Sequence, residues 1–327
     1  MSSSNVELRD MPYGPAGERA RIWHPIAIII GSFFAFYLWA IVPSVVLASM
    51  DAAAGKKDLM AADALLVQYG LPALGVSFAL ILLHFLFWTR VVERRPLTSI
   101  GMFRGGSLGQ YVNGLAYGAM FALIVTLAAF VAALQFGFTM PPMFAGTQSA
   151  LRAEFLPFIA MLIPIVLVQG GTEEVVFRGW MLSALSARTS MTLAVLVSGL
   201  AFGVFHLDRF FMDPKFAAIF IASTVVLGVF LGVWAVQAGS IAGPAGFHGA
   251  YNALLFATSF LDGAANAKPG ATAPQIWAEM MSVEAMQDIV RHTDYIAAMQ
   301  TAVVVCSLIA IAVMLFRGAD RREYAEA

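Results

Sequence analysis

The sequence predicts an all-α fold, a polytopic transmembrane helix bundle with about eight spans. Of its 327 residues, 60% are hydrophobic and only 12% are charged, and the mean hydropathy is +0.80. A soluble domain carries about 25% charged residues, because its exterior needs polar groups. The apolar runs are rich in Ala, Leu and Val and lack the two-residue alternation of strands. Since only helices and closed barrels satisfy their backbone in lipid, these runs predict helices.

Eight apolar segments are long enough to cross a bilayer, since a spanning helix needs roughly 20 apolar residues. In chain order they are about 23–49, 64–89, 108–136, 155–187, 190–208, 215–237, 241–261 and 295–316. We therefore expect a polar N-terminal tail at 1–21, a single transmembrane helical domain at 22–316, and a polar C-terminal tail at 317–327. The N-terminal tail lacks the pattern of a cleaved signal peptide, so we expect the first span in the mature protein.

Charge and cysteine content narrow the class of protein further. The formal net charge of −1 predicts no nucleic-acid partner, and the single cysteine, Cys306, excludes an intramolecular disulfide. Basic residues gather at 9–21, 90–104 and 317–322, which an even number of spans places on one side. That side is expected to be cytoplasmic. Membrane lipid is the expected surrounding, and without organelle signals we expect the bacterial inner (plasma) membrane.

The first of three polar clusters lies in the fourth span, where two adjacent glutamates are followed by an arginine. Ionisable groups inside a bilayer are costly, so their presence indicates a role. Glu174 and Arg178 are four residues apart on a helix and are predicted to form an ion pair. Glu173 is rotated by about 100° from its neighbour and is left as a general base.

The second cluster ends at His206 in the fifth span. The polar break at 188–190 predicts an antiparallel turn between the fourth and fifth spans. Glu173 lies sixteen residues before Thr189, and His206 lies seventeen residues after it. At 1.5 Å per residue both are about 25 Å from the turn, so they are predicted to face each other.

The third cluster, in the seventh span, contains His248 and Asn252, which are four residues apart and share a helix face. His248 follows Pro244 closely, so a straight helix would place it shallower than the other two clusters. We expect a tilt or a helix break to make up the difference.

Together the clusters carry the groups that hydrolysis of an amide bond by water requires. Glu173 and a neutral His206 can hold a water molecule and take its proton. His248 and the Asn252 amide can donate to a developing oxyanion. This chemistry needs no cofactor, and the expected partner is a peptide or protein substrate.

Three alternatives stay open on the residues alone. Glu173, His206 and His248 match the two-histidine, one-glutamate set of a hydrolytic zinc site, although the sequence has no His-Glu-x-x-His motif. Glu173 and Glu174 are also intramembrane acids of the kind that carry protons in transporters. The third alternative is an immunity or scaffold protein without catalytic activity.

The three clusters resemble the CAAX prenyl protease family, also called CPBP or Abi. Its pattern is Glu-Glu-x-x-x-Arg, then Phe-x-x-x-His, then His-x-x-x-Asn. The matching positions, all in order, are Glu173, Glu174, Arg178, Phe202, His206, His248 and Asn252. The resemblance covers about residues 155–260, which is the expected catalytic core.

This resemblance implies a glutamate-type intramembrane endopeptidase with a cavity inside the bundle that opens to the cytosol. It implies that Glu173 and His206 activate water, with Arg178 positioning the glutamate pair. It also implies that His248 and Asn252 stabilise the oxyanion and that no metal is needed. We do not carry over recognition of a prenyl group, because bacterial members of the family act on varied substrates.

Overall fold

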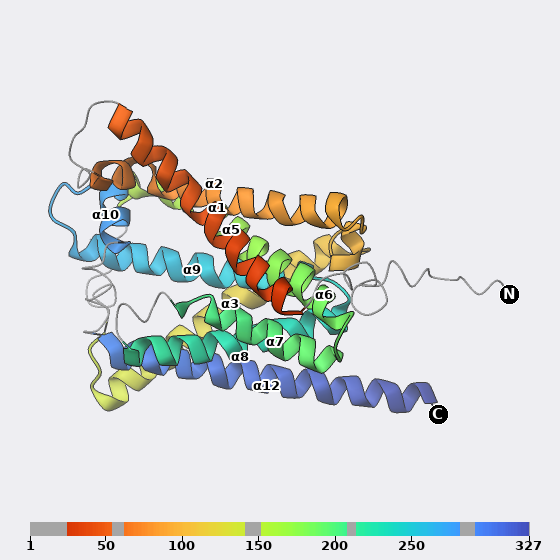
Figure 1. Ribbon diagram of the computed structural model, residues 1–327. Coiled ribbons are helices and arrows are strands. Elements are labelled where there is room, and N and C mark those ends of the chain that lie inside the picture. Colours follow the sequence, from red (N-terminus) through yellow and green to blue (C-terminus); the bar gives the residue numbers. More distant parts are fainter. Residues whose placement is uncertain (1–24, 54–61, 141–151, 208–213, 282–291, 327) are drawn as a thin grey trace.

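The computed structural model describes residues 25–53, 62–140, 152–207, 214–281 and 292–326, and within these ranges every regular element is a helix (Figure 1). The predicted all-α class is therefore confirmed. The tail expected at 1–21 lies outside the described residues. The polar tail expected at 317–327 is helical as far as Glu326, where the last helix ends.

All eight predicted segments form helices. The long ones are α1 (Pro25–Ala53), α2 (Ala62–Phe87), α3 (Ser107–Phe136), α5 (Leu156–Glu174), α7 (Met191–Val204), α8 (Pro214–Ala238), α9 (Ala242–Asn266) and α12 (Thr293–Glu326). α5 continues through a π-helical segment, η8 (Val175–Met181), into α6 (Leu182–Ser186). Shorter helices lie in the connections, namely η4 (Trp88–Val92), η5 (Leu97–Ile100), η7 (Ala153–Phe155) and α10 (Ala273–Met280).

Six of these helical runs, among the residues described, are long and apolar enough to cross a membrane: α1, α2, α3, the run from α5 to α6, α8 and α12. α7 is apolar but has only 14 residues. That length spans about 21 Å, less than a hydrocarbon core of roughly 30 Å. α9 has 25 residues, but it is less apolar and much of it is buried. The eight predicted spans are therefore six long apolar runs, the short α7 and the more polar α9.

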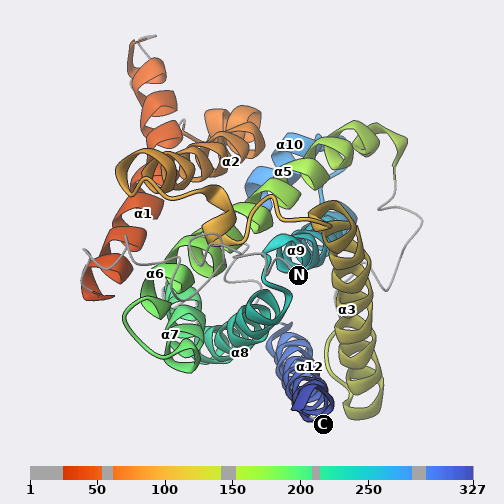
Figure 2. The ribbon, with the colours of Figure 1, turned by 90° about the vertical axis from the view of Figure 1, so that its right-hand side faces the viewer.

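Successive long helices run in alternating directions, and α9 lies near the middle of the bundle (Figures 1 and 2). α9 packs most extensively against α3 and α5, while α1 pairs with α2 at one side of the molecule. The C-terminal ends of α2 and α12 lie at the same end of the bundle (Figure 1). The basic residues Arg90 and Arg317, near these two helix ends, therefore share a side, as the sequence predicts.

Glycine lets α5 and α9 approach closely beside the acidic residues. A Cβ atom on Gly170 would lie 2.7 Å from the backbone nitrogen of Gly249 and 3.0 Å from the carbonyl carbon of His248. A Cβ atom on Gly249 would lie 3.1 Å from the side chain of Leu167. Because no side chain separates the two backbones, Glu174, one turn beyond Gly170, comes next to His248.

The acidic motif does not continue as a regular α-helix. The segment after Glu174 is π-helical over Val175–Met181, and all seven of its residues are buried. π-helical turns are rare and occur often at functional sites. α7 supports this segment, since the hydroxyl of Ser198 donates to the carbonyl of Phe177 at 2.8 Å. The change in helical pitch alters which residues face the bundle beyond the glutamates.

Gly170→Ala is expected to lower the thermal unfolding midpoint in detergent, because the added methyl group would push α5 away from α9. Overpacking of this kind costs about 1–3 kcal/mol. Gly171→Ala is the matched control, because a Cβ atom there meets nothing within 4 Å and alanine is the better helix former. Equal unfolding midpoints for Gly170→Ala and Gly171→Ala would show that α5 and α9 are not in close backbone contact at Gly170.

Candidate active site

The polar centre of the bundle lies where α5 meets α9. Glu173 and Glu174 are the last two residues of α5, Arg178 lies in η8, and His248 lies in the second turn of α9. All four are buried, with at most 6% of their surface exposed. The structure therefore brings together the first and third clusters predicted from the sequence.

Glu174 holds two partners through one carboxylate oxygen. Arg178 Nη1 donates to Glu174 Oε1 at 2.8 Å, and His248 Nδ1 lies 2.8 Å from the same oxygen. The predicted ion pair is present, although a π-helical turn connects its two residues. Because an ionised carboxylate only accepts hydrogen bonds, we assign the proton of His248 to Nδ1. That hydrogen bond fixes the orientation of the ring.

Glu173 faces the other nitrogen of the same imidazole. Its Oε2 lies 3.6 Å from His248 Nε2, and its Oε1 accepts a hydrogen bond from Gln169 Nε2 at 3.2 Å. His248 therefore stands between the two carboxylates. A continuous series of contacts runs from Arg178 through Glu174 and His248 to Glu173.

Gln169 is a site residue that the sequence reasoning missed. It lies one turn before Glu173 on the same face of α5, and its Oε1 is buried without a hydrogen-bond partner among the described residues. A signal was present, since an amide side chain in the middle of an apolar helix precedes a carboxylate by four residues. The amide binds Oε1 of Glu173, whereas His248 faces Oε2 of the same carboxylate.

His206 lies just beyond the end of α7 and reaches the polar centre through Phe202. Its Nδ1 lies 2.9 Å from the carbonyl oxygen of Phe202, and the two ring centroids are 5.3 Å apart. The same phenyl ring lies 5.5 Å from the ring of His248 and 4.3 Å from the guanidinium carbon of Arg178. Phe202 therefore adjoins both histidines and supports the arginine through a cation–π contact.

The hairpin between α6 and α7 has the predicted turn. Residues 187–190 connect the two helices, and the hydroxyl of Ser198 on α7 donates to the carbonyl of Phe177 on η8. This hydrogen bond joins the helical run that carries Glu173 to the helix that ends just before His206. Because residues 175–181 are π-helical, a rise of 1.5 Å per residue does not give the level of Glu173 in this hairpin.

α9 reaches the glutamates because it begins inside the bundle. Residues 243–251 are all buried, and the Ile241 N–H donates to the carbonyl of Gly101 at 3.1 Å. The break that the sequence analysis expected lies before α9, and Pro244 sits in the first turn of the helix, where proline is tolerated.

Asn252 lies one turn after His248 on α9 and is partly buried. The two residues share a helix face, as predicted. Both ring nitrogens of His248 face glutamates, at 2.8 Å and 3.6 Å. His248 is therefore the residue of the third cluster that lies against both glutamates.

The zinc alternative needs Glu173 and the two histidines to converge on one point. Within the described ranges, no three His, Cys, Asp or Glu side chains gather closely enough to hold a metal ion. His206 Nδ1 lies 2.9 Å from the carbonyl oxygen of Phe202, whereas His248 lies against the two glutamates. Glu173, His206 and His248 therefore do not form a preassembled ligand set in this arrangement.

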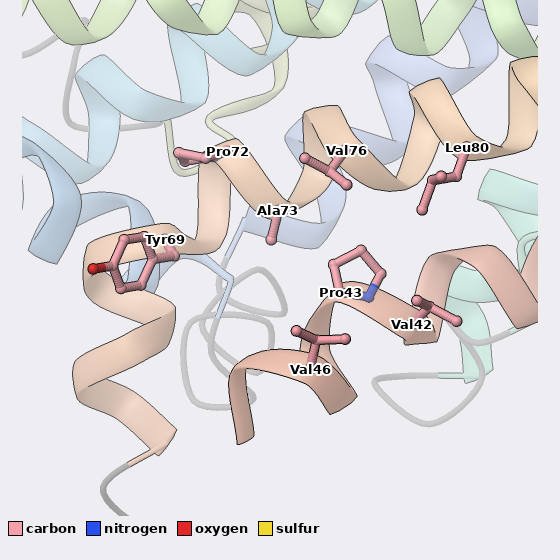
Figure 3. A pocket seen from close by; sticks show the side chains of 8 residues that line it. All are labelled: Val42, Pro43, Val46, Tyr69, Pro72, Ala73, Val76 and Leu80. Atoms are coloured by element: carbon pink, nitrogen blue, oxygen red, sulfur yellow. The ribbon is translucent and has the colours of Figure 1, made fainter. Parts of the chain in front are cut away.

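An apolar groove between α1 and α2 is a separate feature (Figure 3). It has a volume of about 370 Å³ and is lined by side chains such as Pro43, Pro72, Val76 and Leu80. Tyr69 is its one lining residue with a polar side-chain atom. The groove offers no acid–base pair, so the buried cluster on α5 and α9 is the candidate active site.

The helices and the buried cluster define a polytopic integral membrane protein with a carboxylate–histidine site inside its bundle. Residues 155–254 match the family of type II CAAX prenyl endopeptidases, described as Rce1-like. The chain thus carries an Rce1-like domain, as its three motifs indicate, and all six predicted site residues lie within the match. Neither the curated proteins nor the solved structures contain a match to the chain. The family match supports a CAAX-type membrane protease.

Arg178→Met is expected to destabilise the protein, because it leaves the carboxylate of Glu174 buried without its counterion. Breaking a buried pair from one side costs about 3–5 kcal/mol. Combining it with Glu174→Gln should recover much of this loss, since the new amide oxygen still accepts from His248 and no buried charge is left. Thermal unfolding in detergent measures both variants. A combined variant no more stable than Arg178→Met would contradict the buried pair.

Proposed function

We propose that the protein is a metal-independent intramembrane endopeptidase that hydrolyses a peptide bond with water activated by Glu173. The observation that carries the proposal is the buried series Arg178–Glu174–His248–Glu173, which lies inside the Rce1-like match. The proposed substrate is a peptide or protein that enters the bundle from the membrane. The proposed location is the bacterial inner (plasma) membrane.

The two adjacent glutamates take different roles in this proposal. Glu174 and Arg178 neutralise each other, so the pair can be buried in the bundle. Among the described residues, the partners of Glu173 are a neutral amide, Gln169, and the imidazole of His248, so we take its carboxylate as the base. The fixed ion pair orients His248, and His248 in turn faces Glu173 with Nε2.

The reaction then balances as a hydrolysis. Glu173 takes a proton from water while the water oxygen bonds to the peptide carbonyl carbon. The carbonyl oxygen becomes an oxyanion, to which the Asn252 amide donates. The carbon–nitrogen bond breaks as the proton passes to the amine nitrogen, with His248 Nε2 placed to relay it. His206, beside Phe202, is proposed to hold the water on the side opposite His248.

Glu173→Gln is expected to lower kcat for peptide cleavage by about 10²–10⁴-fold, the usual contribution of a general base. The unfolding midpoint should stay close to that of the unmodified protein, because the amide keeps the shape of the side chain. Glu279→Gln, on the exposed face of α10, is the matched control. Cleavage assays on protein in liposomes measure the effect. A variant that cleaves at the unmodified rate would remove Glu173 from the mechanism, and proton flux without cleavage would favour a transporter.

A metal chelator such as EDTA is expected to leave the cleavage rate unchanged, because the proposed mechanism uses Glu173 as the base and, within the described ranges, no three possible ligands gather closely enough to hold a metal ion. The rate is measured before and after prolonged dialysis against the chelator. Loss of cleavage that added zinc restores would overturn the metal-independent mechanism and make Glu173, His206 and His248 the metal ligands.

A further inference from the structure

We propose that residues 93–101, the 93–101 clamp, hold η8 and α9 in register and thereby maintain the contact between Glu174 and His248. Glu93 and Arg95 are its positioning residues. The clamp lies outside the segment that matches the Rce1-like family. This inference rests on the proposed function for its kinetic test but also has a test that needs no cleavage.

The clamp is built around a second buried ion pair. Arg95 Nη1 donates to Glu93 Oε2 at 3.0 Å, and the two residues are 1% and 3% exposed. Arg95 belongs to the basic residues that gather at 90–104 in the sequence. The structure turns it inward, and it ranks among the largest fully buried side chains of the protein.

The pair is bonded to the helical run that carries the catalytic glutamates. Trp180 Nε1, in η8, donates to Glu93 Oε1 at 3.1 Å. Arg95 Nη2 donates to the hydroxyl of Ser183, in α6, at 2.7 Å. A Cβ atom on Gly179 would lie 3.1 Å from the carbonyl oxygen of Ile100, so the clamp also lies directly on the η8 backbone.

The far end of the clamp is attached to the start of α9. The carbonyl of Gly101 accepts from the Ile241 N–H at 3.1 Å, and Gly101 has a φ of +78°. Ile241 lies two turns before His248. One nine-residue segment is thus fixed both to the helical run of Glu174 and to the helix of His248.

The backbone of the clamp is shaped to direct both charged side chains inward. Arg94, between them, has a φ of +54°, in the left-handed region that side-chain-bearing residues seldom occupy. Arg94 and Pro96 are exposed, while Glu93 and Arg95 are buried. Such a conformation persists only where the surrounding contacts hold it in place.

A buried ion pair is a weak source of stability, because desolvation offsets the attraction between the charges. Its directional hydrogen bonds, in contrast, specify position. A π-helical segment needs such support, since its turns are intrinsically less favourable than α-helical ones. The clamp therefore fixes the relative positions of η8 and α9 and contributes little to stability. Its removal should lower kcat without lowering the unfolding midpoint.

The test removes both charges together, with Glu93→Leu combined with Arg95→Met, so that neither partner is left buried alone. We expect an unfolding midpoint equal to or above that of the unmodified protein, an unchanged KM, and a kcat lowered at least tenfold. If the pair served stability only, the midpoint and the amount of folded protein would fall while the kcat of the folded fraction stayed unchanged. That result, or an unchanged kcat with an unchanged midpoint, would overturn the proposal.

Trp180→Phe gives a milder version of the same test. It keeps one aromatic ring but removes the N–H group that donates to Glu93, together with the five-membered ring of the indole. We expect a kcat lowered several-fold with unchanged KM. Trp277→Phe is the matched control, because Trp277 is equally buried but packs in α10, away from the site. Equal kcat values for these two tryptophan variants would contradict the role of the indole.

A third measurement distinguishes failure of the clamp from failure of the proposed function. The energetic coupling between Glu174→Gln and His248→Gln is measured by a double-mutant cycle on unfolding midpoints, with and without the paired change at 93 and 95. We expect clear coupling in the unmodified background and its loss in the paired variant. Unchanged coupling would overturn the clamp, whether or not the protein cleaves peptides. Absence of cleavage by the unmodified protein would overturn only the proposed function.

Discussion

One carboxylate oxygen, Oε1 of Glu174, organises the centre of this membrane protein. It accepts from Arg178 on one side and from His248 on the other, each at 2.8 Å. The first contact neutralises an arginine that has no surface exposed. The second joins two helices, α5 and α9, that are far apart in the chain. Every other feature of the site is arranged around these two hydrogen bonds.

Three features of the backbone make that double contact possible. Gly170 and Gly249 allow α5 and α9 to touch, the π-helical segment changes the direction of Arg178 after Glu174, and α9 begins inside the bundle. None of them is a catalytic group. They explain why two identical neighbouring side chains have different partners. Glu174 is bonded to Arg178, whereas Glu173 accepts from the amide of Gln169 and faces Nε2 of His248.

The sequence was sufficient for the features that depend on composition and on local spacing. The helices follow from long apolar runs, and the pair Glu174–Arg178 follows from a separation of four residues, which places side chains on one helix face. The three motifs also indicated the family whose model matches residues 155–254.

The remaining features depend on contacts between distant segments, which residue spacing does not report. The level of His206 relative to Glu173 does not follow from counting residues, because the count assumes a regular α-helix and the segment after Glu174 is π-helical. The start of α9 is joined to the clamp by the hydrogen bond from the Ile241 N–H to the carbonyl of Gly101, a contact between segments 140 residues apart in the chain. Arg95 lies next to Arg94 in a basic stretch, and nothing in that stretch distinguishes the buried side chain from the exposed one.

The protonation state of the His248 ring tests the central arrangement most directly. Solid-state ¹⁵N NMR of histidine-labelled protein in lipid bilayers reports it, with the His248 signals identified by their absence from the His248→Gln variant. The arrangement described here predicts a neutral ring protonated at Nδ1, with Nε2 open to receive a proton from Glu173. A ring protonated at Nε2 alone, or at both nitrogens throughout, would contradict it.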